Sequence, residues 1–133
     1  MKESKFCTDI VNKLKHYNYF AYKIPDPTSD FAKTVKRPFD IFAYDKVSDN
    51  TLALEVKVST TSTMNVNRIA IHQYSSLKQF RHGYIIVYNT VTKLYSYLHV
   101  DNIIDKDAFR GINEFKRLKD CIEEMLNDTI KTK

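Results

Sequence analysis

The strongest strand signals in the chain lie within residues 38–58, which read PFDIFAYDKVSDNTLALEVKV. Apolar side chains alternate with other residues along 51–58, the pattern of a strand with one buried face. Residues 38–44 also alternate, and residues 45–50 between the two runs are rich in turn formers. The segment therefore predicts an antiparallel β-hairpin in which Tyr44 pairs with Thr51.

The predicted hairpin places two acidic side chains opposite each other. With Tyr44 paired to Thr51, Asp40 faces Glu55 on the surface away from the Leu and Val side chains. Directly opposed Cβ atoms are about 4.5–5.5 Å apart, and two carboxylates at that spacing repel each other. A divalent cation removes the conflict, because Mg²⁺ and Mn²⁺ prefer oxygen ligands and keep several waters for chemistry.

Lys57 follows Glu55 on the same predicted face. Its ammonium can orient or deprotonate a water, or stabilise charge that develops on a phosphate. Asp40, Glu55 and Lys57 with a cation therefore predict a centre that cleaves phosphodiester bonds. The alternative is a solvated outer face on which Lys57 is an ordinary ion-pair partner. The apolar residues around Glu55 favour a central strand. Charged residues are rarely buried on a central strand unless they are paired or functional, and this favours the cleavage centre over a solvated face.

Hydrophobic periodicity along the rest of the chain predicts one α/β domain spanning residues 1–133. The expected order is α-β-β-β-α-β-β-α, and the simplest packing of these elements is a mixed β-sheet flanked by helices. Helices are expected at 3–16, 68–81 and 112–127, with a short piece near 101–109, and strands at 19–25, 38–44, 51–58, 84–88 and 93–98.

Composition sets the outer limits on function. The 133 residues carry a net charge of +5 with a pI near 9.1, which suits a polyanionic partner without specifying one. Cys7 and Cys121 have no zinc-type spacing, and two cysteines form no disulfide framework. The N-terminus lacks the apolar core of a signal peptide, and no apolar run reaches membrane-spanning length. We therefore expect a cytoplasmic protein that makes no use of a membrane.

The acidic motif resembles that of a known nuclease superfamily. Residues 37–40 (RPFD) followed by residues 54–57 (LEVK) resemble the PD-(D/E)xK nucleases. Residues 67–77 (NRIAIHQYSSL), with Gly83 and an apolar strand after them, are similar to the matching part of RecU-type Holliday junction resolvases. The resemblance covers roughly residues 3–98, and archaeal-type resolvases are more distant relatives within the same superfamily.

This resemblance implies a restriction-endonuclease-like fold and a metal-dependent endonuclease. Such an enzyme would act as a homodimer on four-way DNA junctions, in a bacterium or a phage-infected host cell. It would use Mg²⁺, with Mn²⁺ as a substitute. Asp40 and Glu55 would be metal ligands, Lys57 the catalytic lysine, and Gln73 would line the same site from the following helix.

The chain departs from the family pattern in its first helix. Cys7 stands where a metal-binding Glu would be expected, and Glu3, one turn earlier, would have to replace it. The segment 26–36 is also shorter than the projecting segment common in the family. Two alternatives therefore stay open: a non-catalytic nucleic-acid-binding module on the same fold, or a nuclease acting on flaps or duplex DNA.

Basic residues flank the predicted site and are candidates for contacts with DNA phosphates. Phe31 would stack on a base, although an anchor into the core is the alternative. The remaining wealth of Tyr and Phe is assigned to packing of the sheet. Each basic side chain has a solvated surface role as its alternative; the candidates are Lys33, Lys36, Arg37, Arg68, Lys78 and Arg81.

Overall fold

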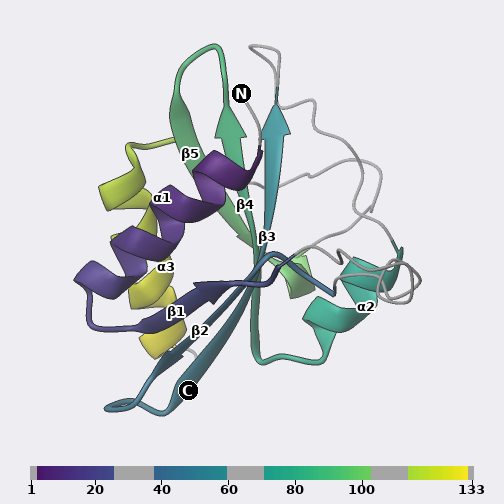
Figure 1. Ribbon diagram of the computed structural model, residues 1–133, viewed down its shortest axis with the longest axis vertical. Helices are drawn as coiled ribbons and strands as arrows, with labels where there is room; N and C mark the ends of the chain where they lie inside the picture. Colours follow the sequence, from purple (N-terminus) through teal and green to yellow (C-terminus); the bar gives the residue numbers. More distant parts are fainter. Residues whose placement is uncertain (1–2, 26–37, 60–70, 103–113, 132–133) are drawn as a thin grey trace.

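The computed structural model describes residues 3–25, 38–59, 71–102 and 114–131. Figure 1 shows a twisted five-stranded sheet with α1 (Glu3–His16) and α3 (Leu118–Lys131) on one face and α2 (Ile71–Lys78) on the other. The remaining elements are β1 (Phe20–Lys23), β2 (Ile41–Asp45), β3 (Asn50–Ser59), β4 (His82–Asn89), β5 (Leu94–His99) and the short 3₁₀ helix η2 (Val100–Asn102). The predicted order of helices and strands and the predicted mixed sheet are confirmed.

The sheet has the order β1-β2-β3-β4-β5, with β3 in the centre. Neighbouring strands run antiparallel except for β3 and β4, which are parallel. A parallel pair needs a crossover connection over one face of the sheet. Helix α2 lies in that connection and therefore packs over the centre of the sheet. The strand order also makes β1 an edge strand.

Side-chain alternation along β3 divides the interior into two cores. Leu52, Leu54 and Val56 face α1 and α3 in the larger one, whereas Ala53 belongs to the smaller one under α2. Further members of the larger core are Ile10, Leu14, Ile86, Ile122 and Met125, and of the smaller one Leu77, Ile85, Val87 and Leu98. No helix within the described residues is long and apolar enough to span a membrane.

The predicted register of the hairpin is confirmed, because Tyr44 pairs with Thr51 and Ile41 with Leu54. Alternation along residues 38–44 predicts that Phe39 shares a face with Ile41, and this prediction is wrong. Strand pairing stops at Ile41, the chain bends before it, and Phe39 turns into the smaller core. Its ring packs edge-on against Phe80, with the ring centroids 5.3 Å apart.

Several predicted boundaries need correction. The helix expected at 112–127 begins only at Leu118, because Lys116 instead pairs with the edge strand β5 through two backbone hydrogen bonds of 2.7 Å with Tyr95. The strand expected at 84–88 is longer and runs from His82 to Asn89. The start of the helix expected at 68–81 and almost all of the piece near 101–109 lie outside the described residues.

Replacing Gly83 tests the packing of α2 on β4. A Cβ at this position would lie 2.5 Å from the carbonyl oxygen of Leu77, closer than such atoms approach. Gly83→Ala should therefore push α2 away from the sheet and lower the free energy of unfolding by about 1–3 kcal/mol, measured by urea denaturation. The control, Val91→Ala on the exposed β4–β5 turn, should leave stability unchanged. Equal stability of Gly83→Ala and the wild type would contradict this packing.

Candidate functional site

Asp40 lies directly before β2, at the point where the hairpin ladder ends. It is buried, and its backbone N–H donates to the carbonyl oxygen of Leu54 at 2.9 Å. Its carboxylate accepts the backbone N–H of Val56 at 2.8 Å. The N–H of Val56 thus bonds to a side-chain oxygen of Asp40 and not to a backbone carbonyl of the β2–β3 ladder. This bond fixes the Asp40 carboxylate beside β3.

This arrangement refines the predicted geometry. The sequence-based expectation was a regular pair in which Asp40 and Glu55 face each other across two strands. Asp40 instead lies outside β2, and its amide bonds to Leu54 rather than to Glu55. The two carboxylates are nevertheless neighbours, because the Asp40 carboxylate accepts the N–H of Val56, the residue directly after Glu55. This proximity lets the negative charge of Asp40 raise the pKa of Glu55.

Glu55 is in the middle of β3 and is only 2% exposed. Alternation puts it on the same face as Ala53, so its side chain leaves the sheet on the α2 side. Its Oε2 lies 3.4 Å from the Nζ of Lys57, whereas its Oε1 is buried without a hydrogen-bond partner. A buried carboxylate oxygen without a partner costs free energy, so this atom is a candidate ligand for a cation.

Burial, followed by the negative charge of Asp40, raises the pKa of Glu55 from 4.5 to about 8. Lys57 opposes this shift but does not cancel it. A carboxyl group without a cation therefore keeps its proton at neutral pH. A pKa displaced this far by desolvation and a like charge is typical of functional sites.

Lys57 lies on the same face as Glu55 and is the most accessible member of the three. Its side chain is 14% exposed, against 2% for Glu55. The site is therefore deep at the carboxylates and reaches solvent at the ammonium. A negatively charged substrate approaching from this side would meet the lysine first.

The donor set fits a hard divalent cation. Mg²⁺ is commonly held by one or two carboxylates, with waters and substrate phosphates completing the coordination. Asp40 and Glu55 supply two carboxylates, one of them with a buried oxygen that lacks a partner. Within the described residues no group of three or more His, Cys, Asp or Glu side chains gathers, so the remaining positions would fall to water and substrate.

Two further predicted site residues lie on the helices. Gln73 is half-buried on α2, the helix that covers the Glu55 side of the sheet. Glu3 is in the first turn of α1, but its side chain lies outside the described part of the structure. Cys7 is buried in the larger core, on the opposite face from Glu55, so position 7 takes no part in the site.

The predicted DNA-binding residues are only partly described. Phe31, Lys33, Lys36, Arg37 and Arg68 lie outside the described residues. Arg81 is exposed after α2, and Lys78 is exposed but already paired with Asp101 at 2.8 Å. Lys78 also lies over the ring of Tyr74, 5.9 Å from its centroid. Its charge is thus partly neutralised within the chain, which weakens its case as a phosphate contact.

Sequence reasoning missed a group of aromatic side chains on β1. Phe20 is 63% exposed and Tyr22 is 46% exposed, although both were assigned to packing of the sheet. Strand alternation could have indicated this exposure, because Ala21, between Phe20 and Tyr22, is buried and its two neighbours must point to the other face. What the sequence could not show is that, of the helices the structure describes, none lies on this face of β1.

The fold has a counterpart among known structures. Over 91% of this chain and 98% of the other, it superposes on Hjc from Archaeoglobus fulgidus, a Holliday junction resolvase from an archaeal hyperthermophile. The TM-score is 0.56 and the sequence identity 14%. The chain shares the fold of this resolvase. At that identity the likeness establishes a restriction-endonuclease-like architecture, whereas no protein-family model and no curated protein matches the sequence.

Protonation of Glu55 makes a measurable contribution to stability. Because its folded pKa is raised from 4.5 to about 8, the folded state holds a proton that the unfolded chain releases. Without divalent ions, stability should fall between those pH values by at most roughly 1.4 kcal/mol per pH unit. Glu55→Gln should remove this loss and unfold at a higher temperature than the wild type at pH 8, but not at pH 4.5. The measurement is thermal unfolding in EDTA, with the exposed Glu114→Gln as control. Parallel pH profiles for wild type and Glu55→Gln would show that Glu55 is not buried in this way.

Proposed function

We propose that this protein is a metal-dependent DNA endonuclease of the resolvase type. The observation that carries the proposal is a buried pair of carboxyl groups: Glu55, with Lys57 beside it, on the central strand β3, and Asp40 directly before β2. The similarity of the fold to that of Hjc supports the same class of reaction. The net charge of +5 suits DNA, whose phosphates attract a basic protein.

Asp40 and Glu55 would hold the cation, Mg²⁺ or its substitute Mn²⁺. When bound there, the cation supplies Lewis-acid stabilisation of a phosphate and lowers the pKa of a bound water. The N–H of Val56 holds the Asp40 carboxylate in one orientation, so that ligand is positioned before any substrate arrives. Lys57, close to Glu55 and reaching solvent, stabilises the negative charge that develops on the phosphate oxygens or orients the attacking water.

The proposed substrate is a four-way DNA junction, cut on two strands by two copies of the chain. A junction has near-twofold symmetry, and a homodimer presents two equivalent sites related by the same symmetry. One site per chain would explain paired cuts without a second catalytic centre.

A non-catalytic DNA-binding module on the same fold is the second candidate. It is favoured by the buried position of Cys7 and by the lack of a third acidic or histidine ligand among the described residues. Such a module would bind DNA in a salt-dependent way but would not cut it.

Cleavage of synthetic DNA tests the proposal. With Mg²⁺, the wild type should cut a four-way junction in preference to a flap or a linear duplex of the same sequence, and EDTA should abolish cutting. Asp40→Asn and Glu55→Gln should bind the junction without cutting it, because they lose a metal ligand. Lys57→Met should cut about 10²- to 10³-fold more slowly, since it lacks the stabilising charge.

Glu114→Gln, an exposed change outside the site, is the matched control and should cut like the wild type. Folding of each variant is verified by circular dichroism. Unimpaired cutting by Asp40→Asn or Glu55→Gln would refute the assignment of the site. Tight binding with no cutting by the wild type would favour the non-catalytic module, and preference for flap or duplex would change the substrate.

A further inference from the structure

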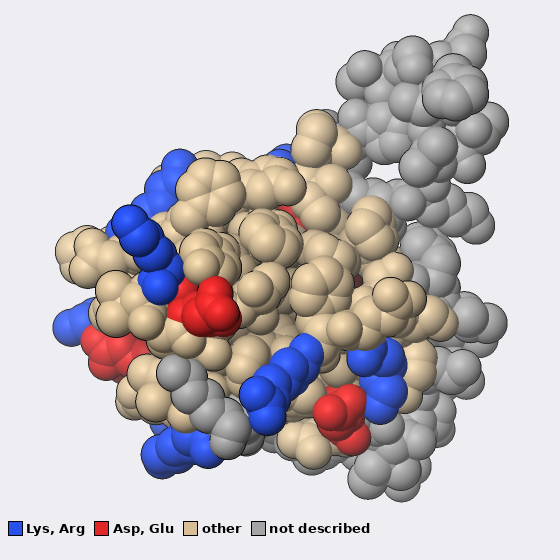
Figure 2. Space-filling model, turned by 90° about the horizontal axis from the view of Figure 1, so that it is seen from below, with Lys and Arg blue, Asp and Glu red and all other residues tan. Residues whose placement is uncertain are grey.

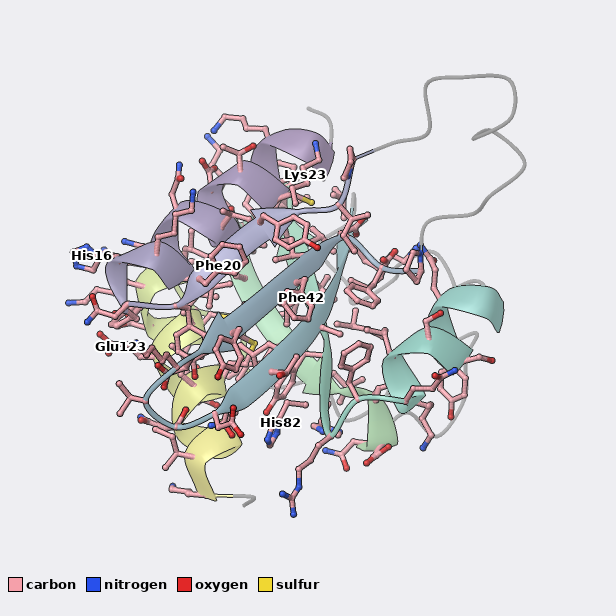
Figure 3. All side chains as sticks on the ribbon, turned by 60° about the horizontal axis from the view of Figure 1, so that its bottom comes forward. His16, Phe20, Lys23, Phe42, His82 and Glu123 are labelled. Carbon is pink, nitrogen blue, oxygen red and sulfur yellow. The ribbon has the colours of Figure 1, made fainter. Side chains whose placement is uncertain are left out.

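The face of β1 and β2 that turns away from α1 and α3 carries a group of exposed and partly exposed aromatic side chains. Strand pairing sets Phe20 beside Tyr44 and Tyr22 beside Phe42. Phe20 and Tyr22 are well exposed, and Phe42 is half-buried. Figure 3 shows Phe42 on the front of the sheet, with Phe20 on the neighbouring strand and α2 to one side. Viewed from below, Figure 2 shows a broad uncharged area bordered by charged side chains.

Three of these rings form a connected series, which we call the aromatic row: Phe20, Tyr22 and Phe42. The ring centroids of Phe20 and Tyr22 are 5.8 Å apart, as are those of Tyr22 and Phe42. The ring planes are tilted by 59° and 49°. The row therefore presents separate ring surfaces to solvent instead of a single flat hydrophobic surface.

The aromatic row leads to the candidate site. Tyr22 and Phe42 form one cross-strand pair, and the backbone N–H of Ile24 donates to the carbonyl oxygen of Asp40 one step further along. Asp40 is therefore two residues from Phe42 on the same strand path, about 7 Å along it. A ligand bound at the Phe42 end of the row would therefore lie near Asp40.

We propose that the aromatic row stacks unpaired DNA bases next to the phosphate that is cleaved. This inference rests on the proposed nuclease function and narrows its substrate to DNA with unpaired nucleotides beside the cut. Aromatic side chains on an open sheet face are a general platform for bases, because every base has a flat π surface. Bases inside a duplex are not available for such stacking, whereas a branch point or a flap exposes them.

Position and charge favour bases over a second copy of the chain. A second copy seated on the row would also stand over the adjoining Asp40 and would block the approach of DNA to the carboxylates. Lys57, beside Glu55 on the same face of the sheet as the row, is a basic side chain near this end of it. A strand whose bases lie on the row would carry its phosphates towards this lysine.

Binding of two short oligonucleotides to the full chain tests the inference. One is a fluorescein-labelled oligothymidylate, and the other is a strand of equal length with abasic sites, which has the same phosphates without bases. In EDTA, which prevents cutting, the wild type should bind the oligothymidylate about tenfold or more tightly. Phe20→Leu/Tyr22→Leu should lose this preference and keep its affinity for the abasic strand, because leucine keeps apolar area but has no π surface.

Two controls frame the result. Phe20→Tyr/Tyr22→Phe keeps both rings and should retain the preference, and Val47→Ala, at the exposed hairpin turn, should behave like the wild type. Equal affinity of the wild type for both strands would overturn the inference. A wild-type dimer that dissociates in Phe20→Ser/Tyr22→Ser, seen by sedimentation velocity, would also overturn it by showing that the row is a contact between copies.

Failure of this inference and failure of the proposed function give different results. Junction cutting by the wild type together with equal affinity for both strands would remove the stacking role and leave the nuclease. A preference for bases without any cutting would remove the nuclease and leave a base-binding surface.

Discussion

Two carboxylates buried side by side are the constraint on which the account of this protein depends. Glu55 is nearly inaccessible, Asp40 raises its pKa, and one Glu55 oxygen has no partner. A sheet selected for stability alone would place apolar side chains at these positions, since buried carboxyl groups are costly in either protonation state unless they are fully hydrogen-bonded. Lys57 and the N–H of Val56 compensate only part of that cost. The arrangement is understandable if a cation completes it.

The rest of the fold serves to hold this pair in place. β3 is the central strand, with a core on each face, so the backbone around Glu55 is fixed on both sides. Helix α2 lies over the sheet next to the acids, and no other helix within the described ranges lies over that face of β1 and β2. The carboxylates therefore lie at the border between a covered and an open part of the sheet, where a large substrate has access to them.

Local patterns in the sequence were enough for the order of elements, the register of the hairpin and the proximity of Asp40 to Glu55. They were insufficient where tertiary contacts override local preference. Residues 114–117 continue a helical pattern but do not join the helix, because Lys116 pairs with the edge of β5. Phe39 leaves the face that alternation assigns to it, because the carboxylate of Asp40 ends the ladder. The exposure of Phe20 and Tyr22 depends on which part of the sheet α2 covers, and no local pattern records that.

Calorimetric titration of divalent metal into the protein tests the central claim most directly. With Mn²⁺ or Mg²⁺ at pH 8, the wild type should bind the ion and release protons, because the cation favours the ionised form of Glu55. Asp40→Asn and Glu55→Gln should give no binding heat, and Glu114→Gln should match the wild type. Absence of binding to the wild type, or equal binding to the Asp40 and Glu55 variants, would contradict the account.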